Sequence, residues 1–104
     1  MSRREREKGK RGEREVAAKL CAFGFDARRD GRLDDDLAHD VAGVHFEVKR
    51  CETLKIPQWS RAAADAAGPD RTPIVVFRRS GESWKAVVEF DYLLELLAER
   101  RQRG

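Results

Sequence analysis

Hydrophobic residues recur along this chain at two different spacings, and the points where one spacing replaces the other predict the order of helices and strands. Val16, Leu20 and Phe23 recur at helical spacing, so we expect a first helix that begins after Gly9 or Gly12. The segments that follow have alternating or continuous apolar residues, which are typical of strands. We expect strands at residues 25–28, 40–42, 45–51, 74–79 and 84–90.

Glycine, proline and polar residues mark the ends of these elements. Residues 29–38 are polar and contain three consecutive aspartates, so we expect a loop there. Pro57 suits the first turn of a second helix, which the pair Gly68-Pro69 ends, and Asp91 can cap a third, leucine-rich helix. The predicted fold is an α/β domain in the order α-β-β-β-α-β-β-α, whose helices pack on one mixed sheet.

Composition agrees with a single domain over residues 1–104 and excludes several classes of protein. The chain is 40% hydrophobic and 39% charged, and a domain of this length buries roughly 65% of its unfolded surface, enough for a core without metal or disulfide support. The longest strongly apolar stretch is Ile74–Phe77, and no apolar segment follows the basic N-terminus. We therefore expect neither a membrane span nor a secretory signal, and a cytoplasmic protein in which Cys21 and Cys51 stay reduced.

Charge is distributed unevenly, although the net charge is only +3. Residues 1–14 carry seven basic groups against three acidic ones, and we treat residues 1–11 as a basic N-terminal arm. Residues 30–40 carry five aspartates against one arginine. A basic segment beside an acidic one suits an enzyme that acts on nucleic acid with a divalent metal, but a small, well-solvated protein can show the same pattern by accident.

Residues 45–51 place two chemically different side chains on one face of the expected strand. Because side chains alternate along a strand, Phe46 and Val48 share the face that enters the core, while Glu47 and Lys49 share the opposite face. An isolated pair of this kind is most often part of a solvated sheet face. A second carboxylate nearby would favour a functional interpretation.

Asp40 is that second carboxylate, seven residues before Glu47 and on the preceding expected strand. If Gly43 and Val44 reverse the chain, Asp40 and Glu47 lie opposite each other in an antiparallel pair. Two adjacent carboxylates repel each other unless a cation lies between them, and Mg²⁺ favours one or two carboxylates with waters and phosphate oxygens. Lys49 beside such a metal would hold the attacking water or stabilise the developing negative charge.

Glu13 is a third candidate carboxylate. It precedes Leu20 by seven residues, so on a helix it lies about 20° from Leu20, along the apolar stripe, where a carboxylate needs a partner. In the alternative, Glu13 lies at the helix start, where the helix dipole favours its charge and water stays close. A histidine–aspartate metal site with His39 and His45 is conceivable, but we expect His45 to be an exposed strand residue.

Together these residues resemble a known family. Lys8-Gly9, three further residues and Glu13-Arg14, followed by Gly24-Phe25 and Arg29, resemble the N-terminus of the archaeal-type Holliday junction resolvases. Asp40-Val41-Ala42-Gly43 and Glu47-Val48-Lys49 resemble the remaining motifs of that family in the same order, so the resemblance covers about residues 8–90. The family belongs to the PD-(D/E)xK, restriction-endonuclease-like nucleases. His39 stands where the name of the motif has proline, and the interval from Asp40 to Glu47 is short.

The resemblance implies a restriction-endonuclease-like mixed sheet of about five strands flanked by helices, and a metal-dependent endonuclease that resolves four-way (Holliday) DNA junctions in paired nicks. It also implies Mg²⁺ as cofactor, with Mn²⁺ able to substitute, branched DNA as substrate and a homodimer as the active form. The implied metal ligands are the carboxylates of Glu13, Asp40 and Glu47 and the carbonyl of Val48, with Lys49 as the catalytic lysine.

DNA-binding candidates come from the same resemblance and from the basic arm. Arg14 and Arg29 match basic residues that the family uses on DNA, and the arm adds Lys8, Lys10 and Arg11. Gln58 begins the second helix, where several related nucleases place a polar residue near the metal, although an exposed helix-start glutamine is the simpler interpretation. Trp59 lies at helical spacing with several alanines, so we expect it in the core rather than stacked on a base.

Other functions stay open. The same site would suit a nuclease for flaps, mismatches or plain duplex. A non-catalytic nucleic-acid-binding module would use the basic arm and would not need the carboxylates. A structural subunit would dock a partner through the last helix, which has more leucines than a narrow stripe needs and is also the candidate dimer surface. These leucines are Leu93, Leu94, Leu96 and Leu97.

Overall fold

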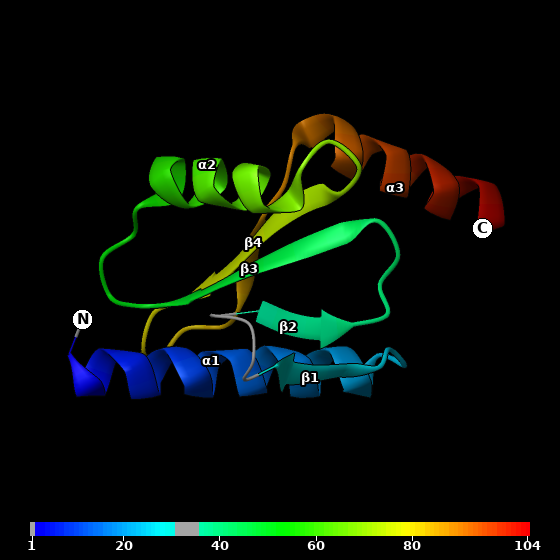
Figure 1. Cartoon of the computed structure of the whole chain (residues 1–104). Coiled ribbons are helices and arrows are strands. Elements are labelled where there is room, and N and C mark those ends of the chain that lie inside the picture. Colours follow the sequence, from blue (N-terminus) through cyan, green and yellow to red (C-terminus); the bar gives the residue numbers. More distant parts are fainter. Residues whose placement is uncertain (1, 31–35) are drawn as a thin grey trace.

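The computed structural model describes residues 2–30 and 36–104, and of Asp36 only the backbone. Within these ranges three helices and five strands follow one another in the order α-β-β-β-α-β-β-α (Figure 1), which confirms the predicted α/β order. The elements are α1 (Arg3–Ala22), β1 (Ala27–Asp30), β2 (Asp36–His39), β3 (Val44–Arg50), α2 (Ile56–Ala67), β4 (Thr72–Arg78), β5 (Lys85–Val87) and α3 (Phe90–Arg103).

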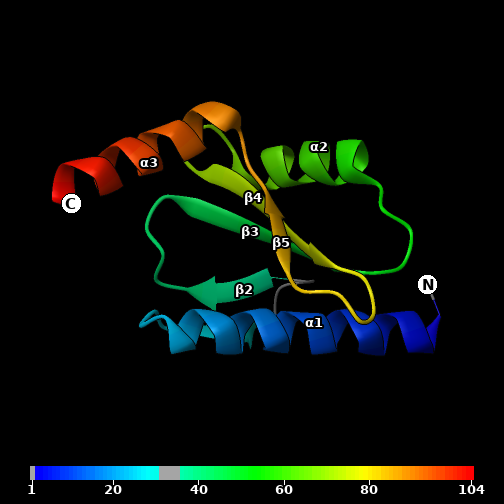
Figure 2. The ribbon, with the colours of Figure 1, turned by 180° about the vertical axis from the view of Figure 1, so that it is seen from behind.

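The elements form three layers, with α1 on one side, the strands in the middle and α2 on the other side (Figures 1 and 2). The middle layer contains two sheets rather than the single sheet expected. β3, β4 and β5 form a mixed sheet in which β3 is parallel and β5 antiparallel to β4, while β1 and β2 form a separate antiparallel pair beside α1. Since parallel neighbours need a crossover, α2 connects β3 to β4.

Helix α1 begins at Arg3, earlier than the expected start after Gly9 or Gly12. Ser2 caps this start, because its Oγ accepts a hydrogen bond from the backbone N–H of Glu5 at 3.1 Å. The segment expected as a basic arm is therefore helical from Arg3 onward. Gly12 is buried, and a Cβ there would lie 3.0 Å from the Cβ of Arg50, so glycine allows α1 to lie close to β3.

The first two strands lie at other residues than the sequence predicted. β1 begins two residues later than expected, and β2 occupies the end of the expected polar loop instead of residues 40–42. The pairing runs from Ala27 with His39 to Asp30 with Asp36, and Leu37 gives β2 a buried side chain. Gly43 turns the chain into β3 with φ +71°. Asp34 and Asp35, expected in the loop, lie outside the described residues.

Two apolar clusters hold the layers together. Between α1 and the strands lie Val16, Ala17, Leu37, Val44 and Phe46, with Val48 packed against them. Between α2 and the sheet lie Trp59, Ala63, Val75 and Phe77, which confirms the expected core position of Trp59. Helix α3 contributes no buried residue. None of the helices in the described ranges is both long and apolar enough to cross a membrane.

Candidate active site

Glu13 lies in the middle of α1 and is buried, with 3% of its side chain exposed. The helix begins at Arg3, so the alternative position at a helix start does not apply, and the inward-facing position is confirmed. Arg29 of β1 faces Glu13, with 3.6 Å between its Nε and the Oε2 of Glu13. This ion pair joins α1 to β1 and provides the partner that a buried carboxylate needs.

Glu47 and Lys49 lie side by side on β3, as strand alternation predicts. The Oε2 of Glu47 is 3.4 Å from the Nζ of Lys49, and its Oε1 is 3.4 Å from the Nε2 of His45. Side-chain exposure rises along the strand from 8% at His45 through 18% at Glu47 to 32% at Lys49. The carboxylate therefore lies between an imidazole and an ammonium group, in a row that opens to solvent toward the end of β3.

His45 is buried, so the expectation of an exposed strand residue is wrong. The reason is that β3 runs through the middle layer, with α1 packed on one side and α2 on the other (Figure 1). The preceding and following residues, Val44 and Phe46, are buried in the cluster on the α1 side. Sequence alternation alone does not reveal that a helix also covers the second face.

Asp40 follows β2 and is exposed, and its hydrogen bonds hold it to the segment before β1. Its Oδ1 accepts a hydrogen bond from the backbone N–H of Asp26 at 2.9 Å, and its own N–H donates to the carbonyl of Asp26 at 3.1 Å. Asp40 therefore extends the β1–β2 pairing. The expected antiparallel pairing of Asp40 with Glu47 is wrong, because β2 pairs with β1 and β3 pairs with β4.

His39 brings the end of β2 next to β3. Its ring packs edge-on against Phe46, with 4.9 Å between the ring centroids. Burial lowers the pKa of His39, the charges of His45 and Arg71 lower it further, and Asp40 opposes them. His45 on β3 thus influences His39 at the end of β2, although the backbones of the two strands are not paired.

A hollow of about 370 Å³ opens beside Asp40. Its lining consists of Asp26, Ala27, Arg28, Ala38, His39 and Asp40, from the ends of β1 and β2. The lining combines carboxylates with a cation and an imidazole. Such a hollow suits a hydrated ion or a phosphate more than an apolar ligand.

Glu13 and Glu47 lie on opposite sides of β3. Glu13 is on α1 with the cluster that contains Phe46, whereas Glu47 pairs in register with Val75, which belongs to the α2 cluster. Within residues 2–30 and 36–104, no group of three or more His, Cys, Asp and Glu side chains could hold a metal ion. The three carboxylates expected to form one ligand set are therefore not brought together as a set.

The donor chemistry of two of these carboxylates nevertheless fits Mg²⁺. This ion is usually held by only one or two carboxylates, together with waters and substrate phosphates. Asp40 and Glu47 are exposed or partly exposed carboxylates of this kind, and Glu47 lies 3.4 Å from His45. Val48, the proposed carbonyl ligand, lies between Glu47 and Lys49 and packs its side chain against the α1 cluster.

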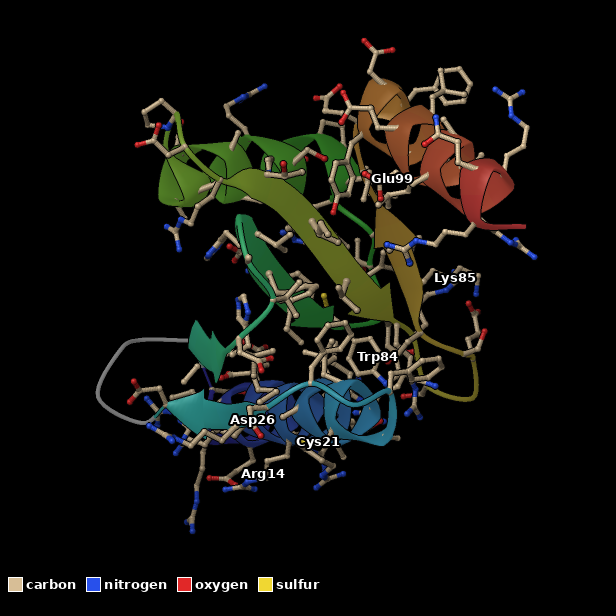
Figure 3. The ribbon with its side chains drawn as sticks, turned by 90° about the vertical axis from the view of Figure 1, so that its right-hand side faces the viewer. Arg14, Cys21, Asp26, Trp84, Lys85 and Glu99 are labelled. Carbon is tan, nitrogen blue, oxygen red and sulfur yellow. The ribbon has the colours of Figure 1, made fainter. Side chains whose placement is uncertain are left out.

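The cations expected to bind DNA divide into two groups. Arg11 and Arg14 are exposed on α1, and Arg14 points away from the strands (Figure 3). Lys10 is half-buried and lies 3.9 Å from Glu7, and the side chain of Arg29 is 25% exposed beside Glu13. Gln58 is exposed in the first turn of α2, which agrees with the simpler of its two interpretations.

Lys8 differs from these residues because it joins α1 to other elements. Its Nζ donates to the Oε2 of Glu52 at 2.5 Å, and Glu52 also accepts hydrogen bonds from the backbone N–H and the hydroxyl of Ser80. These hydrogen bonds lower the pKa of Glu52 from 4.5 to about 2. Lys8 is thus engaged in a tie between α1 and the segments that follow β3 and β4.

Sequence reasoning missed a second tie, which centres on Glu15. Its Oε1 accepts hydrogen bonds from the guanidinium of Arg78 and from the Nε1 of Trp84, the latter at 3.3 Å, and its Oε2 lies 3.6 Å from the Nε of Arg50. The sequence does contain a feature that predicts this tie. Glu15 lies one helical turn from Gly12, so both residues share the face of α1 that approaches the sheet.

Comparison with known protein families, with curated proteins and with solved structures finds no match for this chain.

Proposed function

We propose that this protein is a metal-dependent endonuclease that hydrolyses phosphodiester bonds of branched DNA, resolving four-way (Holliday) junctions by paired nicks. The observation that carries this proposal is the pair formed by Glu47 and Lys49, 3.4 Å apart in the part of β3 where side-chain exposure rises. A carboxylate that can hold a metal and an ammonium that can meet an anionic phosphate are thereby available at one place.

In this proposal Asp40 and Glu47 hold Mg²⁺, which Mn²⁺ can replace. When bound, the ion lowers the pKa of a water molecule and offsets charge on the phosphodiester. Lys49 extends toward solvent, where its ammonium orients the attacking water and stabilises the negative charge that develops on the phosphate. His45 keeps the carboxylate of Glu47 oriented through its 3.4 Å contact.

The carbonyl of Val48 is the outer member of the proposed ligand set, and the carboxylate of Glu13 lies outside this set. Val48 precedes Lys49 in the backbone, so its carbonyl lies close to the pair by connectivity alone. Glu13 belongs to the opposite side of β3, where its ion pair with Arg29 holds β1 against α1. We therefore propose that Glu13 acts mainly by positioning the β1–β2 pair, and with it Asp40.

The outward side of α1 supports DNA as the substrate. Arg3, Arg6, Lys10 and Arg14 follow one another at intervals of three or four residues, so they lie along one side of the helix. This row spans roughly 16 Å, the length of duplex axis over which one DNA strand places about five phosphates. Arg11 is exposed on the same helix, and Arg29 lies on β1 beside Glu13 of that helix. Cations placed in this way bind the phosphate backbone without reading its sequence.

Paired nicks need two active sites, so we propose a homodimer as the acting form. A site of action in the cytoplasm agrees with Cys21 and Cys51, which are both free thiols. One observation favours the main alternative: the cations of α1 would serve a non-catalytic nucleic-acid-binding module equally well. The same site acting on flaps, mismatches or duplex is the second alternative.

Cleavage of labelled DNA tests the proposal. We expect the purified protein to cut a four-way junction with Mg²⁺ or Mn²⁺ and not with EDTA, and to leave flaps and duplex intact. Asp40→Asn and Glu47→Gln should abolish cleavage while junction binding stays equal or tightens, because a negative charge that faces phosphate is removed. Asp65→Asn, on the exposed side of α2, is the matched control and should cleave normally.

Other outcomes of this experiment would each favour another function. Substantial cleavage by either site variant with Mg²⁺ would contradict the assignment of Asp40 and Glu47. Binding by the wild-type protein without cleavage under any metal condition would favour the nucleic-acid-binding module. Equal cleavage of the junction, flap and duplex would favour a nuclease of broader substrate range.

A further inference from the structure

Helix α3 carries five large apolar side chains that remain exposed in the described part of the chain. The helix extends outward from the three layers (Figures 1 and 2) and has no buried residue. The exposed fractions are 68% for Phe90, 38% for Leu93, 45% for Leu94, 43% for Leu96 and 47% for Leu97. On a helix these residues occupy about half of the circumference, and Asp91, Glu95 and Glu99 lie on the other half. Such a face is typical of a helix that packs against another surface.

An apolar hollow of about 230 Å³ lies between α1 and the strands. Its walls are Val16, Leu20, Phe46, Val76 and Trp84, its rim is formed by Phe23 and Phe25, and Lys19 is its charged residue. Figure 3 shows Trp84 between α1 and the strands. Phe23 and Phe25 are 77% and 41% exposed. A cavity of about 150 Å³ holds benzene, so this hollow has room for one or two leucine side chains.

We propose that two copies of this chain associate about a two-fold axis, with the leucines of each α3 inserted in the apolar hollow of the other copy. The C-terminal half of α1, which lines the hollow, and α3 lie at the same end of the molecule in both ribbon views (Figures 1 and 2). In a two-fold interface every contact occurs twice. A two-fold axis at this end of the molecule would therefore place α3 of each copy at the apolar hollow of the other copy. This inference does not depend on the proposed nuclease activity.

The exposed area favours insertion in the hollow over simple pairing of the two α3 helices. With roughly 150–200 Å² for a fully exposed large apolar residue, the five residues of α3 offer roughly 400 Å² and the two rim phenylalanines roughly 200 Å². Pairing α3 with α3 alone would bury about 800 Å² in total, which is typical of crystal-packing contacts. Reciprocal insertion buries about 1,200 Å², which reaches the range of specific interfaces.

Charge at the rim also fits this arrangement. The hollow carries Lys19, and Asp91 and Glu99 flank the two edges of the apolar face of α3. A cation on one surface and carboxylates on the other favour their association and disfavour pairing of one acidic helix edge with its own copy. The C-terminal arginines of α3 lie beyond the leucines and extend into solvent.

Light scattering provides the first test. At micromolar concentration the wild-type protein should have about twice the chain mass of 11.9 kDa. Leu97→Glu on α3 and Phe23→Asp at the rim should each give monomers, and both positions are exposed enough for the fold to persist, which circular dichroism checks. Leu54→Glu is the matched control, because Leu54 is 38% exposed and lies on neither surface. A monomeric wild-type protein, or dimers in both variants, would overturn the proposal.

Disulfide trapping identifies the contact itself. In a Cys21→Ser, Cys51→Ser background, Lys19→Cys chains are mixed with chains that carry cysteine at Leu93, Leu94 or Leu97. We expect a mixed disulfide between the two kinds of chain for at least one position, since a disulfide needs Cα atoms within about 7 Å. Insertion would be contradicted if no disulfide formed at any position, or if disulfides formed only between two chains with cysteine on α3. An intrachain disulfide in a monomer that carries both cysteines would also contradict it. Neither test uses DNA, so a dimer that cuts nothing would overturn only the proposed function.

Discussion

Replacing Gly12 by alanine should destabilise the protein, whereas the same replacement at Gly9 should stabilise it. A Cβ at Gly12 would lie 3.0 Å from the Cβ of Arg50 and 3.4 Å from Cη2 of Trp84, while a Cβ at Gly9 would meet nothing within 4 Å. Both glycines lie inside α1, so the two substitutions change helix propensity equally. The comparison therefore isolates the close approach of α1 to β3, which positions Glu13.

The magnitude follows from two opposing terms. Alanine is favoured over glycine in a helix interior by about 0.8–1.0 kcal/mol. Extra volume in a packed site costs typically about 1–3 kcal/mol. The Cβ of Arg50 is fixed by the backbone of β3 and cannot swing aside, so α1 itself has to move by a few tenths of an ångström. Helix propensity cancels between the two variants, and we expect Gly12→Ala to be less stable than Gly9→Ala by about 1–3 kcal/mol.

Urea unfolding followed by circular dichroism and tryptophan fluorescence measures this difference, provided that the m-values agree. For a domain of about 100 residues, each kcal/mol corresponds to about 4–8 °C in melting temperature, so thermal unfolding gives an independent value. Equal stabilisation by both substitutions would show that α1 does not approach β3 at Gly12. The positions assigned to Glu13 and its ion pair would then be refuted as well.

Three further predictions concern charged residues. Glu13→Gln removes the charge partner of Arg29 and should lower the free energy of unfolding by about 2–4 kcal/mol, somewhat less than the loss of one partner in a fully buried ion pair. Urea unfolding measures this loss, and a value below about 0.5 kcal/mol would contradict the ion pair. Arg14→Ala should reduce the slope of log K against log[salt] for junction binding by about 0.9. Lys8→Ala should leave this slope unchanged, because the ammonium of Lys8 is bound by Glu52. Equal effects of the two substitutions would contradict the assignment of Arg14 to DNA binding and of Lys8 to the tie with Glu52. The lowered pKa of Glu52, about 2 against 4.5, means that its ion pair stabilises the fold above about pH 4.5 and is lost as the pH falls toward 2. The melting temperatures of the wild-type protein and Glu52→Gln should therefore converge between pH 5 and pH 2, and a constant difference would contradict the tie.

Periodicity along the chain was sufficient to predict the type and order of the elements that the structure describes. Helical spacing and strand alternation are local properties, so they also predicted the buried positions of Trp59 and Phe46 and the shared face of Glu47 and Lys49. The boundaries were less predictable. α1 begins early because a serine cap, rather than an apolar residue, defines its start. The second strand lies at Asp36–His39 instead of the expected residues 40–42, because most of this segment belongs to residues 29–38, which have the composition of a polar loop.

The partners of the candidate site residues were decided only by the tertiary structure. Asp40 bonds to Asp26 instead of facing Glu47, because β2 pairs with the strand before it and β3 with a strand that follows a crossover helix. Lys8, far from Glu52 in sequence, meets it because α1 lies across the strands. Strand pairing and ion pairs depend on how complete elements pack in space, and that information is not contained in the spacing of residues along any single element.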